Sequence, residues 1–384
     1  MSVIKRLEVT PIINGVGPAT RLGGLPLSEG VLDAMRLSSS QSFRMEELHL
    51  AAGSYISNLL KVPGALVTCG ASAAISLATA VCLTGNNISR IADLPIVENG
   101  PKNVIIQKSH RDPYDHAVTA VGGVIKEIGF PTSTFPNELE SALDSSIAAI
   151  LWRAGKTGDL LDLATTCKIA HSFNVPVIVD AALFVTPIER LDRYFQDGAD
   201  FVAISGGKAL RGPHTSGLLF AQPSNIRTAM LHHLDMDERP GTWTFPEGAN
   251  DKTQLPRNGI ARAMKVGKEQ ILGLVVAIEE HLINAEYSKG DLEINACESE
   301  LKKVPGVTVT RVFDEAFMVD NLHVAFAKSL SADDLYLRLA AGEPRVMLGQ
   351  EFAWRGTLTI NPMALIEGEG VKIAEKIRSI VKNS

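Results

Sequence analysis

The sequence predicts an α/β protein that has a three-layered large domain and a smaller α+β domain at its C-terminal end. Short, almost wholly apolar runs alternate with helical patterns along most of the 384 residues. Strands of this kind are expected where helices cover both faces of a mostly parallel sheet. The pattern changes beyond Val307 to shorter elements. A chain of this length also exceeds one ordinary compact core, which favours two domains.

The elements follow from these runs in chain order. Between the two domains, a stretch rich in Pro and Gly at 231–259 predicts a long irregular segment, and a helix is expected at 265–281. In the large domain we predict strands at 65–68, 103–107, 147–152, 177–180, 201–205 and 217–221, and helices at 73–83 and 161–173. In the small domain we predict strands at 307–312, 323–327 and 357–360, and helices at 332–341 and 369–381.

The composition limits the classes of partner that we expect for the protein. The formal net charge of -6 gives no electrostatic reason to expect nucleic acid. The apolar runs are too short to cross a membrane, and the first residues lack the apolar core of a signal peptide, so a cytoplasmic location is expected. None of the four cysteines forms a CxxC pair, so we expect reduced thiols and no metal site.

The segment Phe201–Phe220 carries the strongest chemical signal. A buried strand ends at Ser205, two glycines follow, and then comes Lys208. Ligands bind at the carboxyl ends of strands in α/β sheets, and a partly buried lysine there can lose its proton near neutral pH. Gly206 and Gly207 are expected to let the backbone approach a flat cofactor. The alternative is a surface lysine in a glycine-rich turn.

Asp180 ends another apolar strand 28 residues before Lys208. A carboxylate there can pair with a protonated pyridine nitrogen and keep the ring of pyridoxal 5'-phosphate (PLP) an electron sink. The alternative is an N-cap for the next helix. An acid at the end of one strand, followed by a lysine after the next strand, favours a site for PLP.

Two further turns follow predicted strands. Gly70, Ala71 and Ser72 lead into a helix N-terminus, where free N–H groups and the helix dipole can bind a phosphate. Ser205 can add a hydroxyl contact. After the strand at 103–107, His110 can stack on a cofactor ring and Arg111 can bind an anion, although a solvated polar loop is an alternative there.

Together these segments resemble the selenocysteine synthase (L-seryl-tRNA selenium transferase)-like branch of fold-type-I PLP enzymes. Within that branch they are most similar to D-glucosaminate-6-phosphate ammonia-lyase-like proteins. The most specific strings are SGGKALRGP at 205–213 and HRDPYDHA at 110–117. The other strings are INGVGPATRLGG at 13–24, GALVTCGASAAISLA at 64–78, VPVIVDAA at 175–182 and GIARAMKVGKEQILGL at 259–274.

The resemblance implies an aminotransferase-like large domain with a mostly parallel seven-stranded sheet at 46–265. It implies a small domain at 266–384, and an N-terminal segment at 1–45 that packs on the small domain and on a dimer partner. It assigns Lys208 as the Schiff-base lysine and Asp180 as the acid at the ring nitrogen. It places Gly70, Ala71, Ser72 and Ser205 at the phosphate, and His110 at the ring.

The resulting hypothesis is a PLP-dependent lyase. A hydroxy-amino acid or amino-sugar acid displaces Lys208 to form an external aldimine, and α,β-elimination then releases ammonia and a 2-oxo acid. The candidate arginines for the substrate's carboxylate or phosphate are Arg21, Arg111, Arg211 and Arg355; each also fits a surface ion pair. The alternatives are selenium or sulfur transfer, racemisation, and a non-catalytic binding protein of the same fold. No GxGxxG follows a strand, which disfavours a dehydrogenase.

Overall fold

The computed structural model describes residues 3–155, 161–233, 258–283, 288–327 and 331–382. These residues form two compact units. Unit 2 comprises residues 27–280, and unit 1 comprises residues 1–26 together with 281–384. The units therefore divide at other residues than the predicted boundaries at 45 and 265. The segments 27–45 and 266–280 belong to unit 2, where Met35 lies against Gly273.

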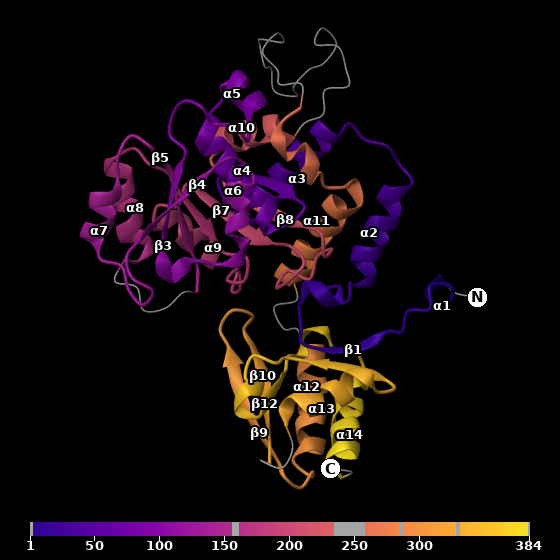
Figure 1. Cartoon of the computed structure of the whole chain (residues 1–384). Coiled ribbons are helices and arrows are strands. Elements are labelled where there is room, and N and C mark those ends of the chain that lie inside the picture. The colour runs from indigo at the N-terminus through magenta and orange to yellow at the C-terminus, as the bar shows by residue number, and fades with distance from the viewer. Residues whose placement is uncertain (1–2, 156–160, 234–257, 284–287, 328–330, 383–384) are drawn as a thin grey trace. The chain divides into compact units, whose positions relative to one another are not determined.

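A seven-stranded sheet forms the centre of unit 2 (Figure 1), in the order β2-β8-β7-β6-β5-β3-β4. Strand β8 is antiparallel to β2 and β7, and the other neighbours are parallel, as predicted. The strands are β2 (Ala65–Thr68), β3 (Asn103–Gln107), β4 (Val124–Ile128), β5 (Ile147–Arg153), β6 (Val177–Asp180), β7 (Phe201–Ser205) and β8 (Gly217–Ala221).

The central strands are buried on both faces. Every residue of β2 and β8 is buried, as is every residue of β6 and β7 except the last. Because successive side chains of a strand point to opposite faces, continuous burial requires a layer of helices on each face. The apolar runs of the sequence are thus explained, and the predicted three-layered α/β architecture is confirmed.

Helices follow the strands along unit 2. Helix α4 packs on β5, β6, β7 and β8, and α8 packs on β6. Side chains cap several of these helices; Asp162, for example, accepts from Thr165 N at the start of α8. The helices are α2 (Glu29–Ser39), α3 (Met45–Leu60), α4 (Ala71–Thr84), α5 (Ile88–Asp93), α6 (His116–Thr119), α7 (Pro136–Ala142), α8 (Leu163–Ser172), α9 (Arg190–Gln196), α10 (Pro223–His233) and α11 (Lys268–Ile283).

Unit 1 contains two small sheets and its own apolar core. The antiparallel sheet has the order β12-β10-β9, and β1 pairs with β11 in parallel. The elements are α1 (Val3–Arg6), β1 (Ile12–Gly15), η1 (Thr20–Leu22), α12 (Ser288–Leu301), β9 (Val307–Asp314), β10 (Val319–Phe326), α13 (Ala332–Ala341), β11 (Arg345–Leu348), η5 (Ala353–Arg355), β12 (Thr357–Ile360) and α14 (Glu369–Lys382). The predicted α+β character of this part is confirmed.

The structure contains three strands that were not predicted, and the first part of one segment predicted to be irregular is helical. Strands β1, β4 and β11 were not predicted, because polar residues interrupt their apolar runs; β4, for example, carries Lys126 and Glu127 at the edge of the sheet. Most of the irregular segment predicted at 231–259 lies outside the described residues. Its first part instead belongs to α10, which ends at His233. No helix within the described residues is long and apolar enough to span a membrane.

Candidate active site at the strand ends of unit 2

Lys208 lies in the connection between β7 and β8, and this connection is closed by its own backbone. Gly206 N donates to Ser216 O at 2.9 Å, and Gly212 N donates to Gly206 O at 2.8 Å. Arg211 N donates to Lys208 O at 2.9 Å. Lys208 is therefore held on a compact loop at the carboxyl end of β7, as predicted for the end of a strand.

The two glycines before Lys208 serve a purpose that the sequence analysis did not identify. A Cβ on Gly207 would lie 2.8 Å from the Cα of His214, and one on Gly206 would lie 2.3 Å from Ser216 Oγ. The missing side chains make room for the returning chain of the same loop. The interpretation that they also let a flat cofactor approach remains a prediction.

The environment of Lys208 favours a neutral amine. The side chain is partly buried, and burial lowers its pKa below the usual lysine value. The charges of Asp180 and Asp112 oppose this shift, so both carboxylates lie close enough to act on the amine. Lys208 is therefore not a surface lysine in bulk water, which was the alternative considered from the sequence.

Asp180 ends β6, the strand next to β7, and its backbone is in register with Ala203. Its Oδ1 accepts from Ala182 N at 3.1 Å, and its Oδ2 accepts from Arg153 Nε at 3.0 Å. The next helix, α9, begins ten residues later with Glu189 at its N-cap position. The alternative that Asp180 caps a helix is therefore wrong.

The predicted phosphate turn lies at the start of α4. Its first backbone bond runs from Ala74 N to Gly70 O, so the N–H groups of the first turn have no partner within the helix. A Cβ on Gly70 would meet nothing within 4 Å, whereas one on Gly217 would lie 2.5 Å from Gly70 C. Strand β8 thus supports one side of the turn, and the other side is open for an anion.

Arg153, which the sequence analysis did not select, joins several of these residues. It ends β5 in register with Asp180, and its side chain is only 5% exposed. Its Nη1 donates to Asp115 Oδ1 at 2.8 Å, and its Nε donates to Asp180. The signal was an arginine at the end of an apolar run, LWR at 151–153, next to the strand that carries Asp180.

His110 is fully buried, and its position is fixed by hydrogen bonds. Arg153 N donates to His110 Nδ1 at 3.1 Å, and the ring packs edge-on against Trp152 with centroids 5.4 Å apart. Because this ring has no exposed surface, contact with a cofactor would require its neighbours to move. The stacking role remains a prediction.

The four candidate substrate arginines lie in both units. Arg111 forms ion pairs with Asp115 and Glu127, and Arg211 is partly buried in the Lys208 loop, with a φ of 53°. Arg21 and Arg355 are exposed residues of unit 1, where the Arg355 guanidinium lies 4.0 Å from the centroid of the Phe352 ring. Their proposed roles in substrate binding remain predictions.

The residues present fit PLP. An amine of lowered pKa, a carboxylate and an anion-binding helix N-terminus belong to the loops and strand ends around β6, β7 and β2. Beside Asp180, the Nη2 of Arg153 is a buried donor without a partner among the described residues. A buried polar group of this kind is expected where a bound molecule completes a site.

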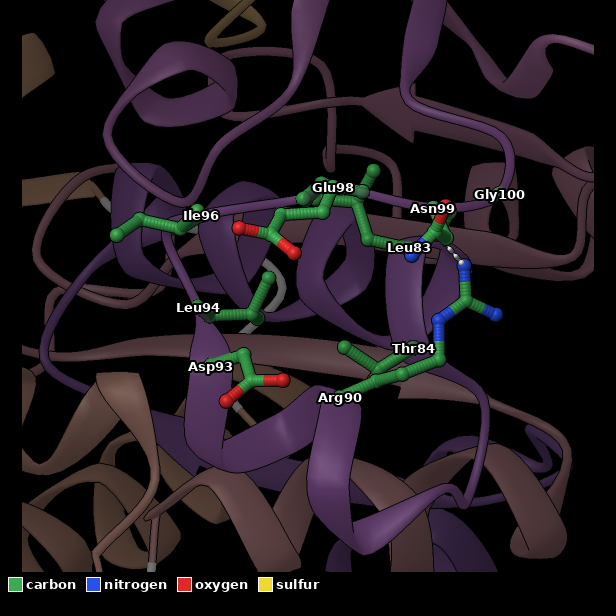
Figure 2. A pocket seen from close by; sticks show the side chains of 10 residues that line it. Leu83, Thr84, Arg90, Asp93, Leu94, Ile96, Glu98, Asn99 and Gly100 are labelled. Atoms are coloured by element: carbon green, nitrogen blue, oxygen red, sulfur yellow. Dashed lines mark hydrogen bonds between the residues drawn. The ribbon is translucent and has the colours of Figure 1, made fainter.

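A separate cavity of about 560 Å³ lies at the other end of α4 (Figure 2). It is lined by Leu83 and Thr84, and by residues of α5 and the following loop. Helix α4 has 14 residues, so this cavity is about 20 Å from the phosphate turn at a rise of about 1.5 Å per residue. None of the predicted site residues lines it.

The fold is that of the fold-type-I PLP enzymes. Among solved structures, an aspartate aminotransferase from Thermus thermophilus superposes with a TM-score of 0.53 at 12% identity, covering 97% of this chain and 99% of that one. This likeness shows the fold alone. No family model matches the chain.

More specific relatives cover nearly the whole chain. It is 26% identical over 399 residues to D-glucosaminate-6-phosphate ammonia lyase of Salmonella typhimurium, covering 100% of this chain and 99% of that protein. A solved D-glucosaminate-6-phosphate ammonia-lyase superposes with a TM-score of 0.84 at 25% identity, covering 100% of this chain and 99% of that one. A 5'-C-glycyluridine monooxygenase-decarboxylase of a Streptomyces species is 28% identical over 377 residues, or 94% of this chain and 87% of that protein. The chain is therefore a homologue of D-glucosaminate-6-phosphate ammonia lyase, as the resemblance implied.

Proposed function

We propose that this protein is a PLP-dependent lyase that eliminates ammonia from a hydroxy-amino acid or an amino-sugar acid and leaves a 2-oxo acid. The observation that carries the proposal is the placement of Lys208. Its partly buried amine follows β7, and Asp180 ends the adjacent strand β6. The similarity to an ammonia lyase over the full length supports this class of reaction.

The residues of unit 2 have distinct parts in holding the cofactor. Lys208 would bind it covalently, Asp180 would pair with its ring nitrogen, and Gly70, Ala71, Ser72 and Ser205 would bind its phosphate. When bound, PLP supplies an electron sink for charge that develops at the substrate α-carbon. Lys208, once freed by the substrate, is placed to take the α-proton, because burial favours its neutral form.

The substrate and the assembly belong to the same proposal. Arg21, Arg111, Arg211 and Arg355 are candidates for binding the carboxylate or phosphate of a small anionic substrate. Because Arg111 already pairs with two carboxylates, it is the least available of the four unless a substrate displaces one of them. We further propose a cytoplasmic homodimer or higher homo-oligomer, as fold-type-I enzymes commonly form.

The relative from Streptomyces favours a second candidate, an oxygen-dependent decarboxylation, because its identity over the shared length is 28%. Both reactions begin at the α-carbon of an amino acid, so the cofactor-binding residues would be shared. The two candidates differ in their products. An elimination releases ammonia and consumes no oxygen, whereas the alternative releases carbon dioxide and consumes oxygen.

The test is reconstitution of the purified chain with PLP. We expect a visible absorbance band of the bound cofactor, and ammonia release from a panel of hydroxy-amino acids and amino-sugar acids with and without phosphate. Lys208→Ala should give neither, and Lys102→Ala, which changes an exposed lysine at the start of β3, should give both. A colourless wild-type chain, or an unaffected Lys208→Ala variant, would overturn the proposal. Oxygen uptake with carbon dioxide release would select the second candidate.

A further inference from the structure

The guanidinium of Arg153 lies between two buried carboxylates. Its Nη1 is 2.8 Å from Asp115 Oδ1, and its Nε is 3.0 Å from Asp180 Oδ2. The side chains of Asp115 and Asp180 are only 8% and 12% exposed. The cation of Arg153 therefore contacts two anions that water screens poorly, and Asp115 pairs with Arg111 as well.

The charged forms of Asp115 and Arg153 depend on each other. Burial raises the pKa of Asp115, but hydrogen bonds from Arg111 and Arg153 outweigh it and hold the pKa below its usual value. Burial likewise disfavours the charged form of Arg153, but the two carboxylates outweigh it and raise its pKa. Without the guanidinium, Asp115 and Asp180 would lose the cation that both of them contact.

The orientation of Asp180 is also fixed by this contact. Arg153 Nε donates to Oδ2, and Ala182 N donates to Oδ1. Each carboxylate oxygen retains a lone pair for one more donor. Arg153 is itself fixed, because its backbone N–H donates to His110 and its side chain donates to Asp115. The carboxylate of Asp180 therefore contacts a rigid support.

We propose that Arg153 is a positioning residue that holds the Asp180 carboxylate in the orientation that aims it at the ring nitrogen of PLP. The inference rests on the proposed function, because it gives Asp180 its role at the cofactor. It also assigns a purpose to Asp115, whose charge the same guanidinium must balance. Asp115 and Asp180 then compete for the same guanidinium.

The experiment compares two cofactors by equilibrium dialysis. One is PLP, and the other is the analogue in which a carbon replaces the ring nitrogen. Arg153→Gln should weaken PLP binding about 10- to 100-fold, the usual cost of removing a supporting contact, and change binding of the analogue by less than about threefold. Arg153→Lys, which keeps one charge but cannot reach both carboxylates, should fall between Arg153→Gln and wild type.

A rescue variant separates this role from simple packing. Asp115→Asn in the Arg153→Gln background removes one of the two facing carboxylates and should restore most of the PLP affinity. Arg193→Gln, which changes an exposed arginine paired with Asp197 alone, should leave both affinities as in wild type. If Arg153→Gln does not fold, Arg153→Lys and the double variant provide the same comparison.

Three outcomes would overturn the inference. They are equal losses for both cofactors, no loss for either, and a double variant that binds PLP no better than Arg153→Gln. Failure of the proposed function is a different result. In that case the wild-type chain itself would not bind PLP.

Discussion

At the scale of single residues, the protonation state of Lys208 is set by opposing influences. Burial lowers its pKa, and the charges of Asp180 and Asp112 raise it. Asp180 has a second, proposed role at the cofactor, but Asp112 is not among the predicted cofactor contacts. Asp112 caps the turn at Pro113–Asp115, where its Oδ1 accepts from Tyr114 N at 2.9 Å. Asparagine can make the same cap, so the charge can be removed alone.

Asp112→Asn should therefore shift the pH dependence of PLP uptake to lower pH. The neutral amine captures the aldehyde, and uptake by the apoprotein rises as Lys208 loses its proton. Removing a nearby anion destabilises the ammonium form and lowers the pKa of Lys208 further. The measurement is the rate of appearance of the visible absorbance band against pH. Glu140→Gln on α7, an exposed carboxylate, is the control and should leave the profile unchanged. A shift to higher pH would contradict the predicted sign.

The sequence allowed the positions of Lys208 and Asp180 to be predicted because each directly follows an apolar strand. Arg153 could not be found in the same way, because its partners lie 27 and 38 residues away in the chain. Only the pairing of β5 with β6 brings it beside Asp180. The steric reason for the glycines before Lys208 was missed for a related reason, since the atoms they avoid belong to residues that return later in the loop.

At the scale of elements, the strands of unit 2 that were predicted correctly are those largely buried on both faces. Continuous apolar runs identify them without knowledge of their neighbours. The edge strand β4 and the paired strands β1 and β11 are short and partly polar, so their pairing depends on contacts that the sequence alone does not show. Helix ends were predicted to within a few residues. The segment 71–84, for example, was expected to be helical over 73–83.

Helices α3 and α10 meet at buried histidines that have no part in the proposed chemistry. The rings of His49 and His233 pack edge-on with centroids 5.0 Å apart. Burial lowers the pKa of His232 to about 4 and, with the charge of His233 as a second cause, that of His49 to about 3. Thr84 Oγ1 donates to Ala80 O, so His232 Nε2 is the donor in its 3.1 Å contact with Thr84.

These histidines predict a loss of stability in mild acid. In the unfolded chain they bind protons below a pKa of about 6.5, whereas in the folded chain they stay neutral, so stability falls as the pH falls from about 6.5 toward their folded pKa values. Between pH 7 and pH 5 the expected loss is about 2 kcal/mol for each such histidine. The His232→Gln variant keeps a donor for Thr84. Between pH 7 and pH 5 its free energy of unfolding, measured with urea, should fall by about 2 kcal/mol less than that of the wild-type chain. His116→Gln, an exposed histidine, should lose as much as the wild-type chain. Equal losses in both variants would contradict this account.

At the scale of the whole molecule, all of the predicted cofactor contacts fall within unit 2. Lys208, Asp180 and the turn at Gly70–Ser72 belong to residues 27–280, which have their own sheet and core. Unit 1 has a separate core around its small sheets, and it contributes only the candidate substrate arginines Arg21 and Arg355. Cofactor binding is therefore predicted to depend on unit 2 alone, and substrate binding on residues of both units.

Hydrogen exchange with and without PLP tests this division. A ligand that binds only the folded state at about 100 times its Kd adds about 2.7 kcal/mol of stability. The slowest amides of unit 2 should then exchange about 100-fold more slowly, because they exchange only when the unit opens. We expect added protection in peptides covering 65–75, 177–182 and 203–217, and little change in those covering 307–326 and 357–360. The Lys208→Ala variant, which cannot capture the aldehyde, should gain much less protection in unit 2. Equal protection in both units would show that the cofactor stabilises the chain as one cooperative body, and the assignment of its binding energy to unit 2 would then be wrong.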